Sequence, residues 1–193
     1  EMSASLVGSE MCIRDRGDEY NAHVNWGKYN MLRKNTDIAV NEFLNAVQLK
    51  DDDIDLLFLL AGLLTESGET NHAAEYYEKI AKLDPTNKEA LRKLAKFREG
   101  IGDYRMQVKY LEKIVEADSK DIQALKELAK ACEKIKDFDG AVSAYNKCLE
   151  LITDPAETQL LKSKLEKLES HGSSSVDDSV GLIDKIMGFF NKG

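Results

Sequence analysis

A repeat of 34 residues limits what this chain can fold into more than any other feature of its sequence. Aligned on this period, residues of similar size recur at the same positions in four consecutive repeats, with no insertion. A fixed period of about 20 to 50 residues indicates an array in which each repeat is one supersecondary element that buries its apolar face against its neighbours. Position one of the four repeats falls at Tyr20, Ile54, Lys88 and Ile122.

Small residues at two positions predict that each repeat is a pair of short helices that cross closely. Position eight is Gly or Ala in every repeat, and position twenty is Ala in all repeats except the third, which has Gln107. Large residues at positions seven and twenty-four, Trp26 and Phe43 in the first repeat, are expected to fill the space beside the crossing. Residues 67–70 have the composition of a turn between two such helices.

The composition agrees with helices and excludes one class of partner. Proline is scarce, with 2 residues, and 42% of the residues are hydrophobic and 32% are charged. A formal net charge of −8 argues against a general nucleic-acid binder, because neutralising phosphates needs a basic face. The longest apolar run, 56–64, is too short for a membrane span, and we expect it to be a core helix.

The repeat resembles the tetratricopeptide repeat (TPR), and the match rests on residues at the family's positions. In the first two repeats these residues are Trp26, Gly27, Ala39, Phe43, Ala46, Gly68, Ala73, Tyr77 and Pro85. Gln107 departs from the pattern and puts close packing of the third repeat in question. The resemblance implies an all-α fold, a right-handed α-solenoid of four TPR hairpins.

The repeat boundaries divide the chain into segments. From Thr158 to Glu169, leucines form one stripe, which resembles the capping helix that covers the last apolar face of such arrays. The expected segments are a leader 1–19, repeats 20–53, 54–87, 88–121 and 122–155, a capping helix 156–170, a linker 171–175 and an amphipathic segment 176–193.

The leader carries no repeat signal. Residues 6–16 resemble the translation of an adapter used in preparing sequencing libraries, so we interpret 1–19 as non-native and the native amino terminus as missing. The three cysteines form neither a metal-ligand spacing nor a disulfide framework, which favours a reducing compartment. We therefore expect a cytoplasmic protein, although the missing amino terminus leaves export open.

No residues with the spacing of a catalytic or metal site are found. The three histidines, His23, His72 and His171, share no ligand spacing, and the metalloprotease, phosphate-loop and nucleophile-elbow motifs are missing. Cys132 and Cys148 fall at positions that face helix contacts, where a small buried residue is more common than a reactive thiol. We predict no enzyme activity, no catalytic residue, no metal and no cofactor.

A binding surface is expected on the first helix of each repeat, where positions two, five, nine and twelve resemble the groove lining of the family. Cations dominate this face in the third and fourth repeats, so acidic peptides are the favoured ligands. The alternative is that these lysines are only solvated, because Glu89, Glu99 and Glu133 lie on the same face. The predicted peptide-binding residues are Lys28, Phe58, Arg92, Lys96, Lys126 and Lys130.

The segment 176–193 has a strongly apolar face on a helical wheel. It could dock on protein, either this chain or a partner, or lie in a membrane interface. Three aspartates against two lysines weaken the membrane alternative. The predicted docking residues are Val180, Leu182, Ile183, Ile186, Met187, Phe189 and Phe190.

These features together predict a protein-protein adaptor or scaffold that holds a protein or peptide in a concave groove. Two alternatives stay open. The chain could be the C-terminal scaffolding half of a larger signalling or enzymatic protein, or a peripheral membrane assembly factor tethered by its C-terminal helix.

Overall fold

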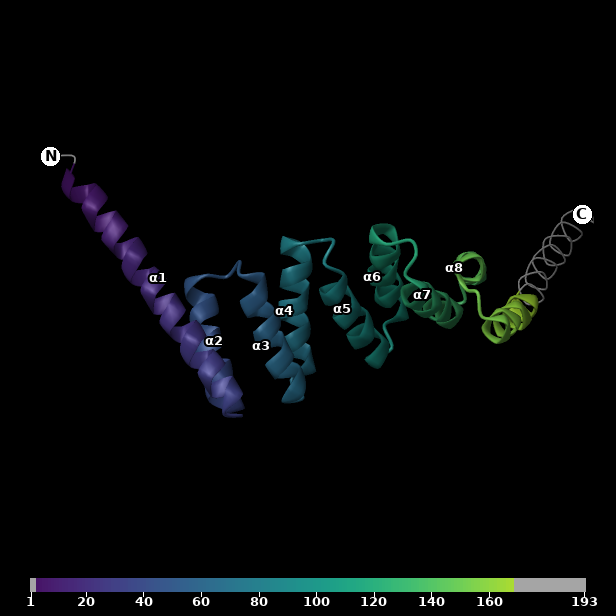
Figure 1. The fold of residues 1–193 in the computed structure, drawn as a ribbon, viewed down its shortest axis with the longest axis horizontal. Coiled ribbons are helices and arrows are strands. Elements are labelled where there is room, and N and C mark those ends of the chain that lie inside the picture. Colours follow the sequence, from purple (N-terminus) through teal and green to yellow (C-terminus); the bar gives the residue numbers. More distant parts are fainter. Residues whose placement is uncertain (1–2, 169–193) are drawn as a thin grey trace, which may run out of the picture. The chain divides into compact units, whose positions relative to one another are not determined.

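The computed structural model describes residues 3–168, with side chains from Asp18 onward. Within these residues every regular element is a helix and no strand occurs, so the described fold is all-α (Figure 1). The labelled helices are α1 (Ser3–Leu32), α2 (Thr36–Leu49), α3 (Ile54–Glu66), α4 (Thr70–Leu83), α5 (Lys88–Gly100), α6 (Tyr104–Ala117), α7 (Ile122–Ile135) and α8 (Phe138–Leu151). A further helix covers residues 155–168.

The segments expected at the two ends of the chain differ in how far the structure describes them. The linker 171–175 and the amphipathic segment 176–193, with all of its docking residues, lie outside the described residues. The leader 1–19 is largely inside them: α1 begins at Ser3 and continues through Tyr20 into the first repeat without a break.

The helices divide between two compact units, Glu1–Phe97 and Arg98–Gly193, with the boundary inside α5. In the first unit, α1 packs with α2 and α3 packs with α4, and α3 also contacts α2. In the second unit, α7 packs against both α6 and α8. Short connections between consecutive helices favour such antiparallel pairs.

Aspartate side chains cap four of the helices. Each accepts a hydrogen bond at 3.0 to 3.2 Å from the backbone N–H three residues later, which satisfies an amide that has no partner inside the helix. Asn87 does the same for Ala90 at the start of α5. The capping aspartates are Asp53, Asp103, Asp121 and Asp137. The helix starts therefore recur with the repeat because their caps recur.

The small residues at position eight are buried in all four repeats. The closest fit is at Gly27, where a Cβ atom would lie 2.4 Å from Cε1 of the fully buried Phe43. α1 and α2 therefore cross at a distance that only glycine allows at this position. Close crossing at position eight explains why the sequence period specifies the packing of the hairpin.

Trp26 does not fill the core, and this part of the expectation was wrong. Leu60, Leu94 and Leu128, at the same repeat position, are buried, whereas Trp26 is 52% exposed. Leu60 is buried because α3 packs against α2 as well as α4. Among the described helices, α1 packs closely against α2 alone. The face of α1 that carries Trp26 therefore stays open to solvent.

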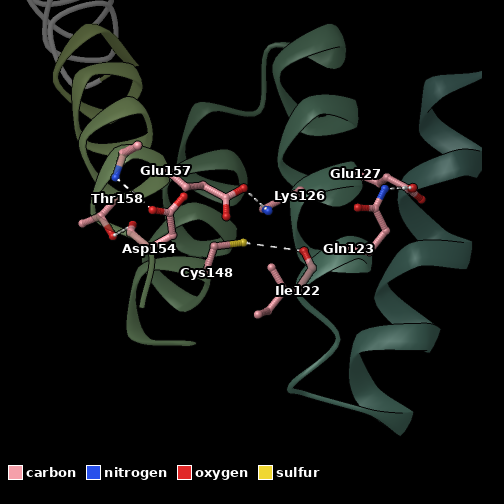
Figure 2. A network of polar contacts seen from close by, with 9 residues as sticks. Ile122, Gln123, Lys126, Glu127, Cys148, Asp154, Glu157 and Thr158 are labelled. Atoms are coloured by element: carbon pink, nitrogen blue, oxygen red, sulfur yellow. Dashed lines mark hydrogen bonds and ion pairs between the residues drawn. The ribbon is translucent and has the colours of Figure 1, made fainter. Parts of the chain in front are cut away.

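The helix 155–168 is the last described element of the second unit, and Figure 2 shows it beside α7 and α8. Leu161 and Leu165 of this helix are buried. Lys126 on α7 makes an ion pair with Glu157, which links the two elements (Figure 2). Gln107, whose polarity put the packing of the third repeat in question, is itself buried.

Candidate binding surface

The first unit has a hollow of about 440 Å³ beside α3, here called the unit 1 hollow. Phe58 is half-buried in it, and its ring lies 5.9 Å from the ring of Tyr77, centroid to centroid, in a tilted arrangement. Gly62 has open space where a Cβ would be, so the hollow is not filled by its own wall. The lining residues are Asp55, Phe58, Leu59, Gly62, Tyr77, Glu89 and Lys93.

The unit 1 hollow combines an apolar wall with a mixed charged rim. Phe58, Leu59 and Tyr77 provide the apolar part, while Asp55, Glu89 and Lys93 provide two negative charges and one positive charge. Burial is the main cause that raises the pKa of Tyr77. The hollow can hold an apolar side chain and can hydrogen-bond polar groups at its edge.

The second unit has a polar hollow of about 300 Å³, here called the unit 2 hollow, between the end of α5, α6 and α7. Gln107 lies in its wall, and Gln123 Nε2 donates a 2.6 Å hydrogen bond to Glu127 Oε1 (Figure 2). Glu133, also in the wall, accepts a 2.5 Å hydrogen bond from the hydroxyl of Tyr145. Amide, carboxylate and ammonium groups therefore all face one depression.

The predicted peptide-binding residues differ in where they lie. Phe58 lines the unit 1 hollow and Lys130 lines the unit 2 hollow. Lys126 is engaged by Glu157, so its charge is already compensated within the chain (Figure 2). Lys28, Arg92 and Lys96 are exposed and line neither hollow.

Position six of the repeat contributes to both hollows, although the sequence analysis did not include it among the binding positions. Leu59 and Lys93 line the unit 1 hollow, and Glu127 lines the unit 2 hollow. Positions two, six and nine follow one another at i, i+4 and i+7, which places them on one stripe of a helix. That spacing could have identified position six as part of the lining of the hollows. Tyr77 comes from the second helix of the hairpin, and only the packing of α4 on α3 brings it to the hollow.

The described residues show little of the geometry that catalysis needs. No group of three His, Cys, Asp or Glu side chains within them could hold a metal ion. Burial raises the pKa of Cys132 to about 11 and also raises that of Cys148, so both stay thiols at neutral pH. None of the described helices is long and apolar enough to span a lipid bilayer.

Comparison with known sequences identifies repeats of one family. Two family models, both described as tetratricopeptide repeat, match residues 54–97 and 122–155. The second match has the same limits as the fourth repeat derived from the period. No protein of curated function matches the sequence with significance.

Solved structures with a similar fold cover most of the chain. A crystal structure of MamA matches with a TM-score of 0.62 at 17% identity, covering 83% of this chain and 92% of that one. MamA from residue 41 to its end, from Desulfovibrio magneticus RS-1, matches with a TM-score of 0.59 at 18% identity, covering 83% and 94%. YrrB, described as a TPR protein with an unusual peptide-binding site, matches with a TM-score of 0.61 at 14% identity, covering 81% and 83%.

At these identities the likeness concerns the fold, and it agrees with the repeat matches and with the helical hairpins of the structure. Repeats of this kind form interaction scaffolds. Residues 54–97 and 122–155 of this chain are therefore tetratricopeptide repeats, set in an all-α fold.

Proposed function

We propose that this protein is a non-enzymatic adaptor that binds an extended segment of a partner protein and anchors one apolar side chain of that segment in the unit 1 hollow. The observation that carries the proposal is the half-buried ring of Phe58 beside Tyr77, with the opening kept free by Gly62. An apolar wall with a few polar groups at its edge is the usual composition of a ligand site. The peptide-binding site ascribed to YrrB, a protein of similar fold, supports it.

The cations of each unit suggest which ligand groups that unit would hold. Lys93 stands at the rim of the unit 1 hollow and Lys130 in the wall of the unit 2 hollow, while Arg92 and Lys96 are exposed on α5. Carboxylates of the ligand would form charge-assisted hydrogen bonds with such groups. Because Lys126 is paired with Glu157, we assign it the smallest contribution of the predicted cations.

The proposal is tested by selecting ligands from a random peptide library displayed on phage, with the full chain immobilised. We expect enrichment of peptides that carry a large apolar residue next to acidic residues. Phe58→Ala should weaken binding of the selected peptide at least about tenfold, as expected for truncation of a buried aromatic anchor.

Charge reversal distinguishes specific contacts of the ligand from general electrostatic attraction between the ligand and the protein. Lys96→Glu should weaken binding of a peptide held by unit 1, and Lys130→Glu binding of a peptide held by unit 2, each by about 3 to 10 times, while thermal stability stays unchanged. Lys82→Glu and Lys113→Glu are the matched controls, because these exposed lysines lie on α4 and α6 and line neither hollow. A library that yields no specific peptide, or a selected peptide that binds Phe58→Ala as tightly as wild type, overturns the proposal.

A further inference from the structure

A further depression of about 260 Å³ lies between α6, α7 and α8 in the second unit and is here called the α8 pocket. It shares no residue with the unit 2 hollow, so the two are separate. Its floor is apolar and buried, and consists of Val115, Leu125, Leu128, Cys132 and Ala144. The charged and hydroxyl groups of its exposed rim belong to Glu112, Glu116, Asp137, Ser143 and Lys147.

The α8 pocket is open because the fourth repeat lacks an aromatic ring that two other repeats have. Position twenty-three is Tyr76 in the second repeat, where it is half-buried, and Tyr110 in the third, where it is buried. This side of α4 faces the preceding repeat, since Lys79, three residues after Tyr76, pairs with Asp51 at 2.6 Å. The fourth repeat has Ala144 at this position, and Ala144 lines the pocket beside α6.

The rim of the α8 pocket is acidic. Three carboxylates, of Glu112, Glu116 and Asp137, stand against the one ammonium group of Lys147. Within the described residues Glu112 and Glu116 make no ion pair. After burial itself, the charges of Asp137 and Glu112 raise the pKa of Cys132, which places these carboxylates near the floor. The pocket therefore suits an aromatic side chain that has cations beside it.

The amphipathic segment 176–193 of the chain offers this combination. Phe189 and Phe190 are adjacent in it, with Lys185 before them and Lys192 after them, and its three aspartates all precede Lys185. The segment follows the helix 155–168, which lies beside α7 and α8, two of the helices that form the pocket (Figure 2). Residues 169–179 can span up to about 36 Å when extended, which allows the segment to reach back.

We propose that the segment 176–193 docks on its own chain in the α8 pocket, with a phenylalanine ring above Ala144 and its lysines beside the acidic rim. A tether of this length gives the segment a high effective concentration at the pocket, so modest contacts suffice to keep it bound. The inference uses the second unit and does not depend on the unit 1 hollow, so the peptide selection and the docking measurement can fail separately.

The first test is limited trypsin digestion of the full chain, with cleavage after Lys185 followed by intact mass. Cleavage of a docked segment is limited by the fraction that is undocked. We expect wild type to be cleaved at least about tenfold more slowly than the double variant Phe189→Ala with Phe190→Ala. Equal rates for these two chains overturn the proposal.

Filling the pocket tests the site without changing the cleaved sequence. Ala144→Tyr, which supplies the ring of the other repeats, should accelerate cleavage at least about tenfold. Ala156→Tyr is the matched control, because Ala156 is exposed in the same unit and does not line the pocket. Circular dichroism checks that both variants are helical. Equal cleavage rates in Ala144→Tyr and Ala156→Tyr overturn the assignment to this pocket.

The rim offers a variant with no burden on the core. Glu112→Lys with Glu116→Lys should accelerate cleavage by about 3 to 10 times, because both side chains are exposed and the change repels the lysines of the segment. Glu150→Lys, at an exposed position of α8 outside the pocket, should leave the rate unchanged. No acceleration by the rim variant relative to Glu150→Lys overturns the charge pairing.

The second test distinguishes docking within one chain from docking between copies. The cleavage rate of wild type should be the same at about 1 and 100 µM, because a tethered segment does not depend on protein concentration. A labelled peptide of residues 176–193 should bind the Phe189→Ala with Phe190→Ala chain at least about tenfold more tightly than wild type, whose own segment competes. Protection that rises with protein concentration, or equal peptide affinity for the two chains, overturns docking within the chain.

Discussion

The hydroxyl of Tyr20 on α1 donates a 2.6 Å hydrogen bond to Oδ2 of Asp53, the residue that caps α3. The other oxygen of the same carboxylate accepts from the backbone N–H of Leu56 at 3.1 Å. One side chain thus starts the second repeat and attaches it to the first. The hydrogen bond from Tyr20 is the main cause that lowers the pKa of Asp53, and burial followed by this bond raises the pKa of Tyr20.

Tyr20→Phe should destabilise the protein by about 1 kcal/mol at pH 7, the usual net contribution of a hydrogen bond to a partly exposed group. Urea unfolding measures the difference. Tyr76→Phe is the control, because the Tyr76 hydroxyl makes no hydrogen bond within the described residues and is half-buried.

The effect of Tyr20→Phe should also depend on pH. Asp53 has a lowered pKa in the folded state, so its contribution is complete above the unfolded pKa of about 3.9 and is lost as the pH falls through the folded value. The difference between wild type and Tyr20→Phe should therefore shrink in acid. A difference that is the same at pH 7 and in acid would show that the bond does not act through the Asp53 carboxylate.

Gly27→Ala should destabilise the first hairpin by about 1 to 3 kcal/mol, the cost of overpacking a core. The added Cβ would lie 2.4 Å and 2.5 Å from two ring carbons of Phe43, which is fully buried and has no room to move away. Gly62→Ala is the matched control: nothing lies within 4 Å of its Cβ, so the better helix propensity of alanine should stabilise α3 by about 0.5 to 1 kcal/mol. Chemical denaturation of both variants distinguishes them, and equal stabilities would mean that the helices do not cross closely at position eight.

The repeat and its small residues could be predicted because they depend on spacing along the chain. Ala61 and Ala129 are buried at the position that the period assigns to them. Trp26 could not be placed from the period, because its burial depends on which helices pack against α1 and, among the described residues, only α2 does so closely. A periodic pattern describes every repeat alike, whereas burial also depends on the elements that pack against each repeat.

The candidate site was only partly predictable for a related reason. Phe58 could be identified from its helix face, but Tyr77 reaches the hollow from another helix. The ion pair of Lys126 with Glu157 joins residues 31 positions apart, through the packing of the helix 155–168 beside α7. Contacts between elements decide which charges remain available, and the helical wheel of one element does not contain them.

Cys132 and Cys148 should react slowly with a thiol reagent in the folded protein. Both are buried, and a pKa of about 11 for Cys132 leaves about one thiolate in a thousand at pH 8. The measurement is the rate of reaction with Ellman's reagent in a Cys12→Ser background, with and without urea. Rapid reaction of either thiol in the folded protein would contradict its structural role.

The hollow beside Phe58 is proposed to hold the ligand, so filling that hollow without disturbing the fold should abolish binding. Gly62→Leu places a side chain where the Cβ has nothing within 4 Å, and Gly100→Leu makes the same change at another open glycine that lines neither hollow. Calorimetric titration with the selected peptide should show binding to Gly100→Leu at wild-type affinity and no measurable binding to Gly62→Leu, with both variants as helical as wild type. Wild-type affinity in Gly62→Leu would show that the ligand does not occupy the unit 1 hollow.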